Sequence, residues 1–166
     1  MSRWRPPQAR STAIITPAGY SALEKELAAL WTKRRIVNDA LAAAAAEGDR
    51  SENAEYIYRK KEQAGIDRRI RYLQKRMPDL KVVDQIGNKN QIFFSATVTL
   101  TKEDEHEVSY TIVGPDETDA KRNFISIDSP LAKALLKKQV DDEVNVTIGE
   151  IDTLYTIVSI SYSELS

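Results

Sequence analysis

The sequence predicts an α+β protein, in which an N-terminal antiparallel α-helical coiled-coil hairpin precedes a C-terminal antiparallel β domain with one short helix. Three observations predict this class. In the first half, apolar residues recur in alternating steps of three and four, which is the period of a helical seam. From residue 92 onward the period changes to two, as in half-buried strands. Only a few residues around Gly48 separate two helical patterns, and so short a link makes neighbouring helices antiparallel.

The first helical pattern has a clear start and stop. Thr16 and Pro17 provide an N-cap and a first helical residue, and Gly48 provides a stop just past Glu47. Its seam contains one polar position, Arg34. The seam positions are Leu23, Leu27, Leu30, Arg34, Val37, Leu41 and Ala44.

The second helical pattern ends at Pro78 and contains one glycine, Gly65, which should weaken it by ~1 kcal/mol relative to alanine. Its seam positions are Tyr56, Arg59, Gln63, Ile66, Ile70, Leu73 and Met77. About 30 residues at ~1.5 Å each give a rod on the order of 45 Å long. The seam becomes small and polar near the turn, so the tip should be the least stable part, and the shape serves reach.

The second half predicts strands from Val98, Tyr110, Val144 and Val158 and their alternating neighbours. One short helix interrupts them over residues 131–138, with Ser129 as N-cap and Pro130 at its first position. The predicted division of the chain is a basic N-terminal extension at 1–14, the hairpin at 15–84, a linker at 85–91 and the β domain at 92–166.

Composition excludes several classes of protein and site. The formal net charge of −1 argues against a protein that coats nucleic acid through bulk positive charge. The absence of cysteine excludes disulfides, thiolate metal sites and cysteine nucleophiles. No apolar run reaches the ~18 residues of a membrane span and no signal sequence is visible, so we expect a cytoplasmic protein. His106 is the only histidine, and neither a glycine-rich phosphate loop nor a nucleophile elbow is found.

The most specific local feature is a pair of acids, Asp49 and Glu52, which lie three residues apart where the second helical pattern begins. Asp-x-x-Glu is a capping box, and spacing alone favours this interpretation. The same two carboxylates also suit Mg²⁺, which typically takes one or two protein carboxylates and keeps its other ligands. Two side chains are too few for an autonomous site, so any ion would be shared with another molecule.

The second helical pattern is heavily basic behind the acidic tip, with interleaved tyrosines. Its cations are Arg59, Lys60, Lys61, Arg68, Arg69, Arg71, Lys75 and Arg76. They have two interpretations, and both stay open at this point. Most charge runs are solvated helix faces. Basic residues with interleaved aromatic rings also form tracks for a single-stranded nucleic acid.

Several segments together resemble the bacterial Gre transcript cleavage factors. They are Gly-Asp-Arg-Ser-Glu-Asn-Ala-Glu-Tyr at 48–56, Ile-Asp-Arg-Arg-Ile-Arg-Tyr-Leu at 66–73, Leu-Lys-Val-Val-Asp at 80–84 and Phe-Ile-Ser-Ile-Asp-Ser-Pro-Leu-Ala-Lys-Ala-Leu-Leu-Lys-Lys at 124–138. The resemblance spans residues 15–162 in the family's order. The Arg-Ser inside the tip and the basic second helix are similar to the GreB type rather than the GreA type.

This resemblance implies that residues 92–166 form an FKBP-like domain that binds bacterial RNA polymerase, and that the hairpin enters the polymerase's secondary channel. It further implies that Asp49 and Glu52 are the catalytic and metal-binding acids. They would help to hold the second Mg²⁺ and an attacking water in the polymerase's own active site, with no metal bound autonomously. The chain would not itself be an enzyme. It would stimulate hydrolysis of backtracked RNA by the polymerase and so rescue arrested complexes.

By the same resemblance, the basic face contacts the 3′ segment of the nascent RNA through Arg59, Lys60, Lys61 and Arg68. Contact with the polymerase falls at Ser129 and Pro130, although Ser-Pro is also an ordinary helix cap. The resemblance implies a monomer without a membrane partner.

Two segments depart from the family pattern. Residues 1–12 form an extension with Arg3, Arg5 and Arg10, and the segment 146–150 lacks the usual Pro-Gly-like turn. Three other functions remain as alternatives. A channel-binding regulator without cleavage activity is disfavoured because both tip acids are present, a prolyl isomerase because no aromatic-lined pocket is visible, and a free-standing nuclease because metal ligands are missing.

Overall fold

The computed structural model describes residues 10–47 and 53–163 and confirms the expected α+β class. The helices are α1 (Pro17–Ala46), α2 (Ala54–Arg76) and α3 (Pro130–Leu135), and the short 3-10 helices are η1 (Met77–Asp79), η2 (Pro115–Glu117) and η3 (Ala120–Arg122). The strands are β1 (Ile14–Ile15), β2 (Lys81–Val82), β3 (Thr97–Thr101), β4 (Glu107–Val113), β5 (Phe124–Ser126), β6 (Glu143–Ile148) and β7 (Ile151–Ser161). The described helices include none that is long and apolar enough to cross a membrane.

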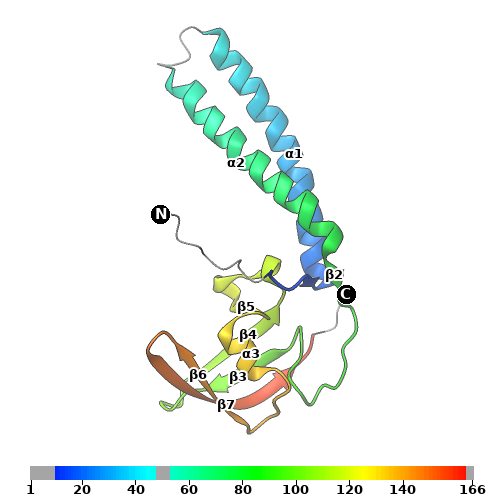
Figure 1. Ribbon diagram of the computed structural model, residues 1–166, viewed down its shortest axis with the longest axis vertical. Helices are drawn as coiled ribbons and strands as arrows, with labels where there is room; N and C mark the ends of the chain where they lie inside the picture. Colours follow the sequence, from blue (N-terminus) through cyan, green and yellow to red (C-terminus); the bar gives the residue numbers. More distant parts are fainter. Residues whose placement is uncertain (1–9, 48–52, 164–166) are drawn as a thin grey trace, which may run out of the picture. The chain divides into compact units, whose positions relative to one another are not determined.

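The long helices α1 and α2 lie side by side as the predicted antiparallel hairpin (Figure 1). Val37, Ile66 and Ile70 are buried along the predicted seam, with Leu27 and Leu30 packed against them. The start of α1 is also confirmed, because the Thr16 Oγ1 accepts a hydrogen bond from the Gly19 N–H at 3.1 Å and α1 begins at Pro17.

Gly65 lies in the middle of α2. Glycine loses more backbone conformational entropy on folding than alanine does, and this loss destabilises the helix. A Cβ built at this position meets only the Arg68 Nη2, at 4.0 Å, so alanine fits without a clash. We expect Gly65→Ala to raise the free energy of unfolding by ~1 kcal/mol, measured by urea titration of the helical circular dichroism signal.

Gly149 is the control for this substitution, since its φ of 64° is left-handed although its Cβ would also meet open space. Gly149→Ala should therefore destabilise the protein. Equal effects of the two substitutions would contradict the explanation by backbone conformation.

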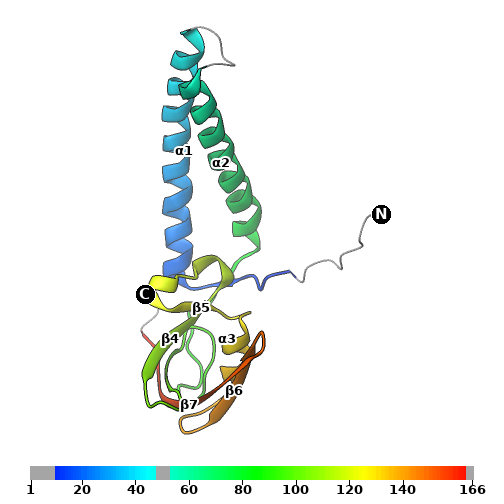
Figure 2. The same ribbon diagram turned by 90° about the vertical axis from the view of Figure 1, so that its left-hand side faces the viewer.

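The second half folds as a strongly curled sheet with strand order β5-β4-β3-β7-β6 and with α3 against its inner face (Figure 2). The pairs β3–β4, β3–β7 and β6–β7 are antiparallel, as predicted, whereas β4–β5 is parallel. Gly149 and Glu150 form the two-residue turn between β6 and β7, so the left-handed glycine makes a Pro-Gly-like turn unnecessary. The core contains Val98, Leu100, Ile112, Leu135, Val144 and Ile157.

A parallel pairing that the periodicity did not predict brings together residues before α1 and after α2. β1 pairs with β2, Ile14 opposite Lys81 and Ile15 opposite Val82. The chain accordingly divides into a helical unit, Tyr20–Leu80, and a sheet unit that includes the residues on both sides of it. The sequence had assigned 15–84 to the hairpin, whereas residues 15–19 and 81–84 belong to the compact unit that contains the sheet.

Two carboxylates of the sheet unit hold the segment before α1. The Glu117 side chain accepts hydrogen bonds from the Thr16 N–H at 2.8 Å, the Thr16 hydroxyl and the Gly114 N–H at 3.0 Å. The Asp128 side chain accepts from the Thr12 N–H at 2.9 Å and from the Thr12 hydroxyl. Each acid thus binds both polar groups of one threonine, which fixes residues 12–16 to the sheet unit.

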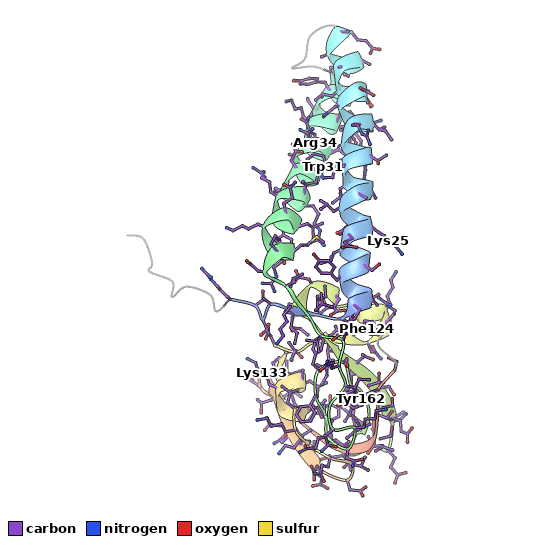
Figure 3. The ribbon with its side chains drawn as sticks, turned by 90° about the vertical axis from the view of Figure 1, so that its right-hand side faces the viewer. Lys25, Trp31, Arg34, Phe124, Lys133 and Tyr162 are labelled. Carbon is purple, nitrogen blue, oxygen red and sulfur yellow. The ribbon has the colours of Figure 1, made fainter. Side chains whose placement is uncertain are left out.

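The end of the linker is fixed by Tyr162, which follows β7. Its hydroxyl donates to the Gln91 carbonyl and accepts from the Phe93 N–H at 2.9 Å. Burial raises the pKa of Tyr162, so the hydroxyl keeps the proton that it donates. Figure 3 shows Tyr162 within the sheet unit.

Candidate functional site

Asp49 and Glu52, the predicted catalytic and metal-binding acids, lie outside the described residues. The beginning of α2 behind them is well defined. Asn53 is its N-cap: the Oδ1 accepts from the Tyr56 N–H at 3.1 Å, while the Nδ2 donates to the Ala44 carbonyl of α1 at 2.8 Å. One asparagine therefore caps α2 and also satisfies a carbonyl in the last turn of α1.

The prediction that Asp49 is the N-cap of the second helix is wrong, because the N-cap of α2 is Asn53 and the helix begins at Ala54. The Asp-x-x-Glu spacing matched a capping box, but Asn53 is an equally good cap and can also reach the neighbouring helix, which spacing cannot reveal. The N–H group of Tyr56 that a cap must satisfy already has its partner. This capping bond therefore does not need the carboxylate of Asp49 or Glu52.

Arg59, the first predicted RNA-contacting residue, forms ion pairs within α2. Its Nε lies 2.8 Å from the Glu55 Oε1 and its Nη1 lies 3.0 Å from the Glu62 Oε2. The hydrogen bonds to Glu55, and then to Glu62, raise the pKa of Arg59. Its positive charge is thus shared with two acids, which weakens its attraction for a third partner.

The other three predicted RNA-contacting residues, Lys60, Lys61 and Arg68, are exposed. Over the stretches 10–47 and 53–163, no acid forms an ion pair with any of them. Lys61, Arg68 and Lys75 are spaced by seven residues, which places them along one face of α2. This face keeps its charge available for an external anion.

Two other arginines that the sequence grouped with the basic run or the seam have structural partners across the hairpin. Arg69 forms a two-pronged ion pair with Glu26, and the closest nitrogen–oxygen distances are 2.9 Å. The Arg34 Nε lies 2.7 Å from the Asp67 Oδ1. Arg34 also lies 5.9 Å from the Trp31 ring, and Figure 3 shows these two side chains as neighbours on α1. Sequence reasoning missed these pairings because their partners lie on another helix.

Ser129 and Pro130, the predicted polymerase contact, form the start of α3. The Ser129 Oγ accepts from the Ala132 N–H at 3.3 Å, and Pro130 occupies the first helical position, so the capping interpretation is confirmed. Pro130 is exposed. Asp128, one residue before this pair, is the acid that binds Thr12. The hydrogen bonds of Asp128 and Ser129 therefore hold this corner in place.

In the part of the chain that the structure describes, no group of three or more His, Asp or Glu side chains is arranged to hold a metal ion.

Comparison with known proteins gives matches along almost the whole chain. The family model described as "Transcription elongation factor, N-terminal" matches residues 13–82. The family model described as "Transcription elongation factor, GreA/GreB, C-term" matches residues 87–162. The boundary between the two matches falls within the segment that follows β2.

Individual relatives carry a more specific name. The protein named "Transcription elongation factor GreB" in Xanthomonas axonopodis pv. citri (strain 306) is 56% identical over 168 residues, covering 99% of this chain and 100% of that protein. Its namesake in Pseudomonas aeruginosa is 51% identical over 164 residues, covering 98% of each. A solved structure of the transcription factor Gfh1 covers 92% of this chain and 99% of its own, with 24% identity and a TM-score of 0.45.

Proposed function

Because the chain belongs to the GreA/GreB family of transcription elongation factors and is of the GreB type, we propose that it stimulates cleavage of backtracked nascent RNA by bacterial RNA polymerase. In this proposal the hairpin enters the secondary channel of the polymerase. The polymerase active site hydrolyses the RNA, and the arrested complex resumes elongation from the new 3′ end. The chain is an activator of this hydrolysis rather than an enzyme.

The observation that carries the proposal is the assignment of the α2 cap to Asn53. The hydrogen bond from the Tyr56 N–H to Asn53 needs neither Asp49 nor Glu52, which lie between the two long helices in the sequence. Two carboxylates cannot form an autonomous Mg²⁺ site, but they can complete one that another protein begins. Asp49 and Glu52 would supply oxygen ligands to a Mg²⁺ ion in the polymerase active site and orient a water there. A Mg²⁺ ion at such a site supplies charge neutralisation and activates bound water.

The exposed cations of α2 support the RNA part of the proposal. Lys60, Lys61 and Arg68 lack acidic partners within the described chain, so their charge can attract the phosphates of the extruded 3′ segment. Arg59 contributes less to this attraction, because Glu55 and Glu62 already bind it. The exposed Pro130, next to the capping Ser129, is the corner that we propose contacts the polymerase.

The test uses elongation complexes that are stalled in a backtracked position with end-labelled RNA. Adding the protein should raise the rate of internal RNA cleavage at least tenfold over the polymerase's own rate, since ligands positioned at a reacting centre are typically worth that much or more. The same RNA with the protein and Mg²⁺ alone should remain intact. Cleavage without polymerase would show a free-standing nuclease, and binding to polymerase without stimulation would show a regulator of another kind.

A further inference from the structure

Two isoleucines are exposed beside the turn that joins β6 to β7. Ile148 and Ile151 pair directly across these two strands, and the residues are 63% and 71% exposed. Alternation along β6 places Ile148 on the same face as the buried Val144 and Val146. The apolar face that forms the core of the sheet unit therefore continues past the core and ends in water. We call residues 148–152 the turn patch.

The strands around the turn patch carry only negative charge. Residues 139–163 contain acids but no lysine, arginine or histidine. None of these acids forms an ion pair with a cation among residues 10–47 and 53–163. The acids are Asp141, Asp142, Glu143, Glu150 and Asp152. A partner that complements the turn patch therefore offers both an apolar side chain and positive charge.

This charge disfavours several kinds of partner. RNA and an anionic membrane surface would be repelled by the acids. A second copy of the chain would bring like charges together, since a two-fold contact joins the same patch on both subunits. Another acidic stretch of the sheet unit, residues 103–107, contains no large apolar side chain. The turn patch thus suits a segment that is both basic and apolar.

The chain contains a segment of this chemistry in residues 1–9, which lie outside the described residues. Arg3 and Arg5 flank Trp4 in this N-terminal segment, and the segment contains no acid. The proposed function uses none of these side chains. Their charge and their aromatic ring match what the turn patch lacks.

The N-terminal segment is long enough to reach the turn patch. Thr12 is fixed to the sheet unit by its hydrogen bonds to Asp128, and Trp4 precedes Thr12 by eight residues. Eight residues span up to about 27 Å when extended. A unit of about 100 residues has a radius of gyration of about 13 Å. So short a tether also keeps the segment at a millimolar effective concentration, which populates even a weak contact.

We propose that the N-terminal segment binds the turn patch of its own chain, with Trp4 against Ile148 and Ile151. Burial of apolar surface supplies the attraction, and the arginines on either side of the ring neutralise acids of the patch. The contact goes beyond the proposed function, because it gives the basic extension a binding site on the sheet unit. It covers isoleucines that would otherwise promote association between chains.

Tryptophan fluorescence tests this contact. All proteins carry Trp31→Phe, which leaves Trp4 as the only tryptophan and changes an exposed residue of the helical unit. The measurement is the quenching constant of Trp4 with acrylamide, taken at micromolar protein concentration and repeated over a range of concentrations.

The test variant adds Ile148→Thr and Ile151→Thr, which keep β-branched side chains at two exposed strand positions. The matched control adds Val140→Thr and Val158→Thr, which make a similar change at two exposed valines outside the turn patch. Circular dichroism shows that each protein is folded.

The quenching constant of Trp4 should be about twofold higher in the test variant than in the Trp31→Phe protein, because contact with two isoleucines hides about half of the ring. The matched control should leave the constant unchanged. Arg3→Gln combined with Arg5→Gln should also raise it, because the acids then lose their partners. This second variant changes no residue of the sheet, so a folding defect cannot imitate its effect.

Equal quenching constants in the Trp31→Phe protein and the test variant would overturn the proposal. Protection of Trp4 that increases with protein concentration would overturn it as well, because the partner would then be a second copy. So would protection that appears only when bacterial RNA polymerase is added. These results would leave the proposed function intact, since the RNA cleavage assay tests it separately.

Discussion

Replacing Asp49 with Asn, or Glu52 with Gln, is expected to lower stimulated RNA cleavage by about a hundredfold while the protein remains folded and bound to polymerase. Each change keeps the size of the side chain and removes its negative charge, which is what a Mg²⁺ ion requires from a ligand. Folding should persist because the cap of α2 is Asn53, whose hydrogen bonds to Tyr56 and Ala44 do not involve either acid.

The measurement is the cleavage rate in stalled complexes at saturating protein, together with a direct assay of polymerase binding. Glu47→Gln is the matched control, since Glu47 is an exposed acid just after α1 and belongs to the same acidic cluster in the sequence. It should change the rate less than twofold, because screened surface charges contribute little. Near-normal cleavage by both Asp49→Asn and Glu52→Gln would contradict a catalytic role of the tip acids.

The second large effect is expected at Glu117, where alanine should lower the free energy of unfolding of the sheet unit by about 3 kcal/mol. The wild-type carboxylate accepts from the Thr16 N–H, the Thr16 hydroxyl and the Gly114 N–H. Removing it leaves the N–H groups of the half-buried Thr16 and the buried Gly114 without this partner, and each lost bond costs about 1 kcal/mol. Thr16 is also the N-cap of α1, so the start of that helix loses support at the same time.

Urea titration measures this effect, with unfolding followed by the far-ultraviolet circular dichroism signal of the β-strands. Glu103→Ala is the control, because Glu103 is an exposed acid of the sheet unit that has no hydrogen bond or ion pair among the described residues. It should change stability by less than about 0.5 kcal/mol. A loss below about 1 kcal/mol for Glu117→Ala would mean that water replaces the carboxylate at little cost.

The features that the sequence predicted correctly depend on neighbouring residues. Thr16 with Pro17, and Ser129 with Pro130, begin helices because a hydroxyl caps an amide three residues on and proline fits the first turn. The seam residues Val37, Ile66 and Ile70 are buried as their spacing predicted. The helical period and the local capping residues are enough to predict these helix starts and these buried positions.

The α2 cap shows where local reasoning stops. Asp49 and Asn53 are both good caps on propensity, and the sequence pattern favoured Asp49. The structure has Asn53, whose second hydrogen bond reaches Ala44 on the neighbouring helix. Local reasoning also cannot tell which basic residues are paired with acids. The acids that neutralise Arg34 and Arg69 lie on the opposite helix.

Period and spacing alone determined the hairpin, the alternating strands, the short capped helix and the position of two acids between the long helices. Only the tertiary structure decided which carboxylates serve the fold and which cations stay available. Glu117 and Asp128 bind threonines that are 101 and 116 residues away in the chain. Local propensities act over three or four residues, whereas such bonds form only once the sheet brings distant segments together. The tip acids are therefore visible in the sequence, whereas the choice of Asn53 as the cap of α2 depends on a hydrogen bond to the neighbouring helix.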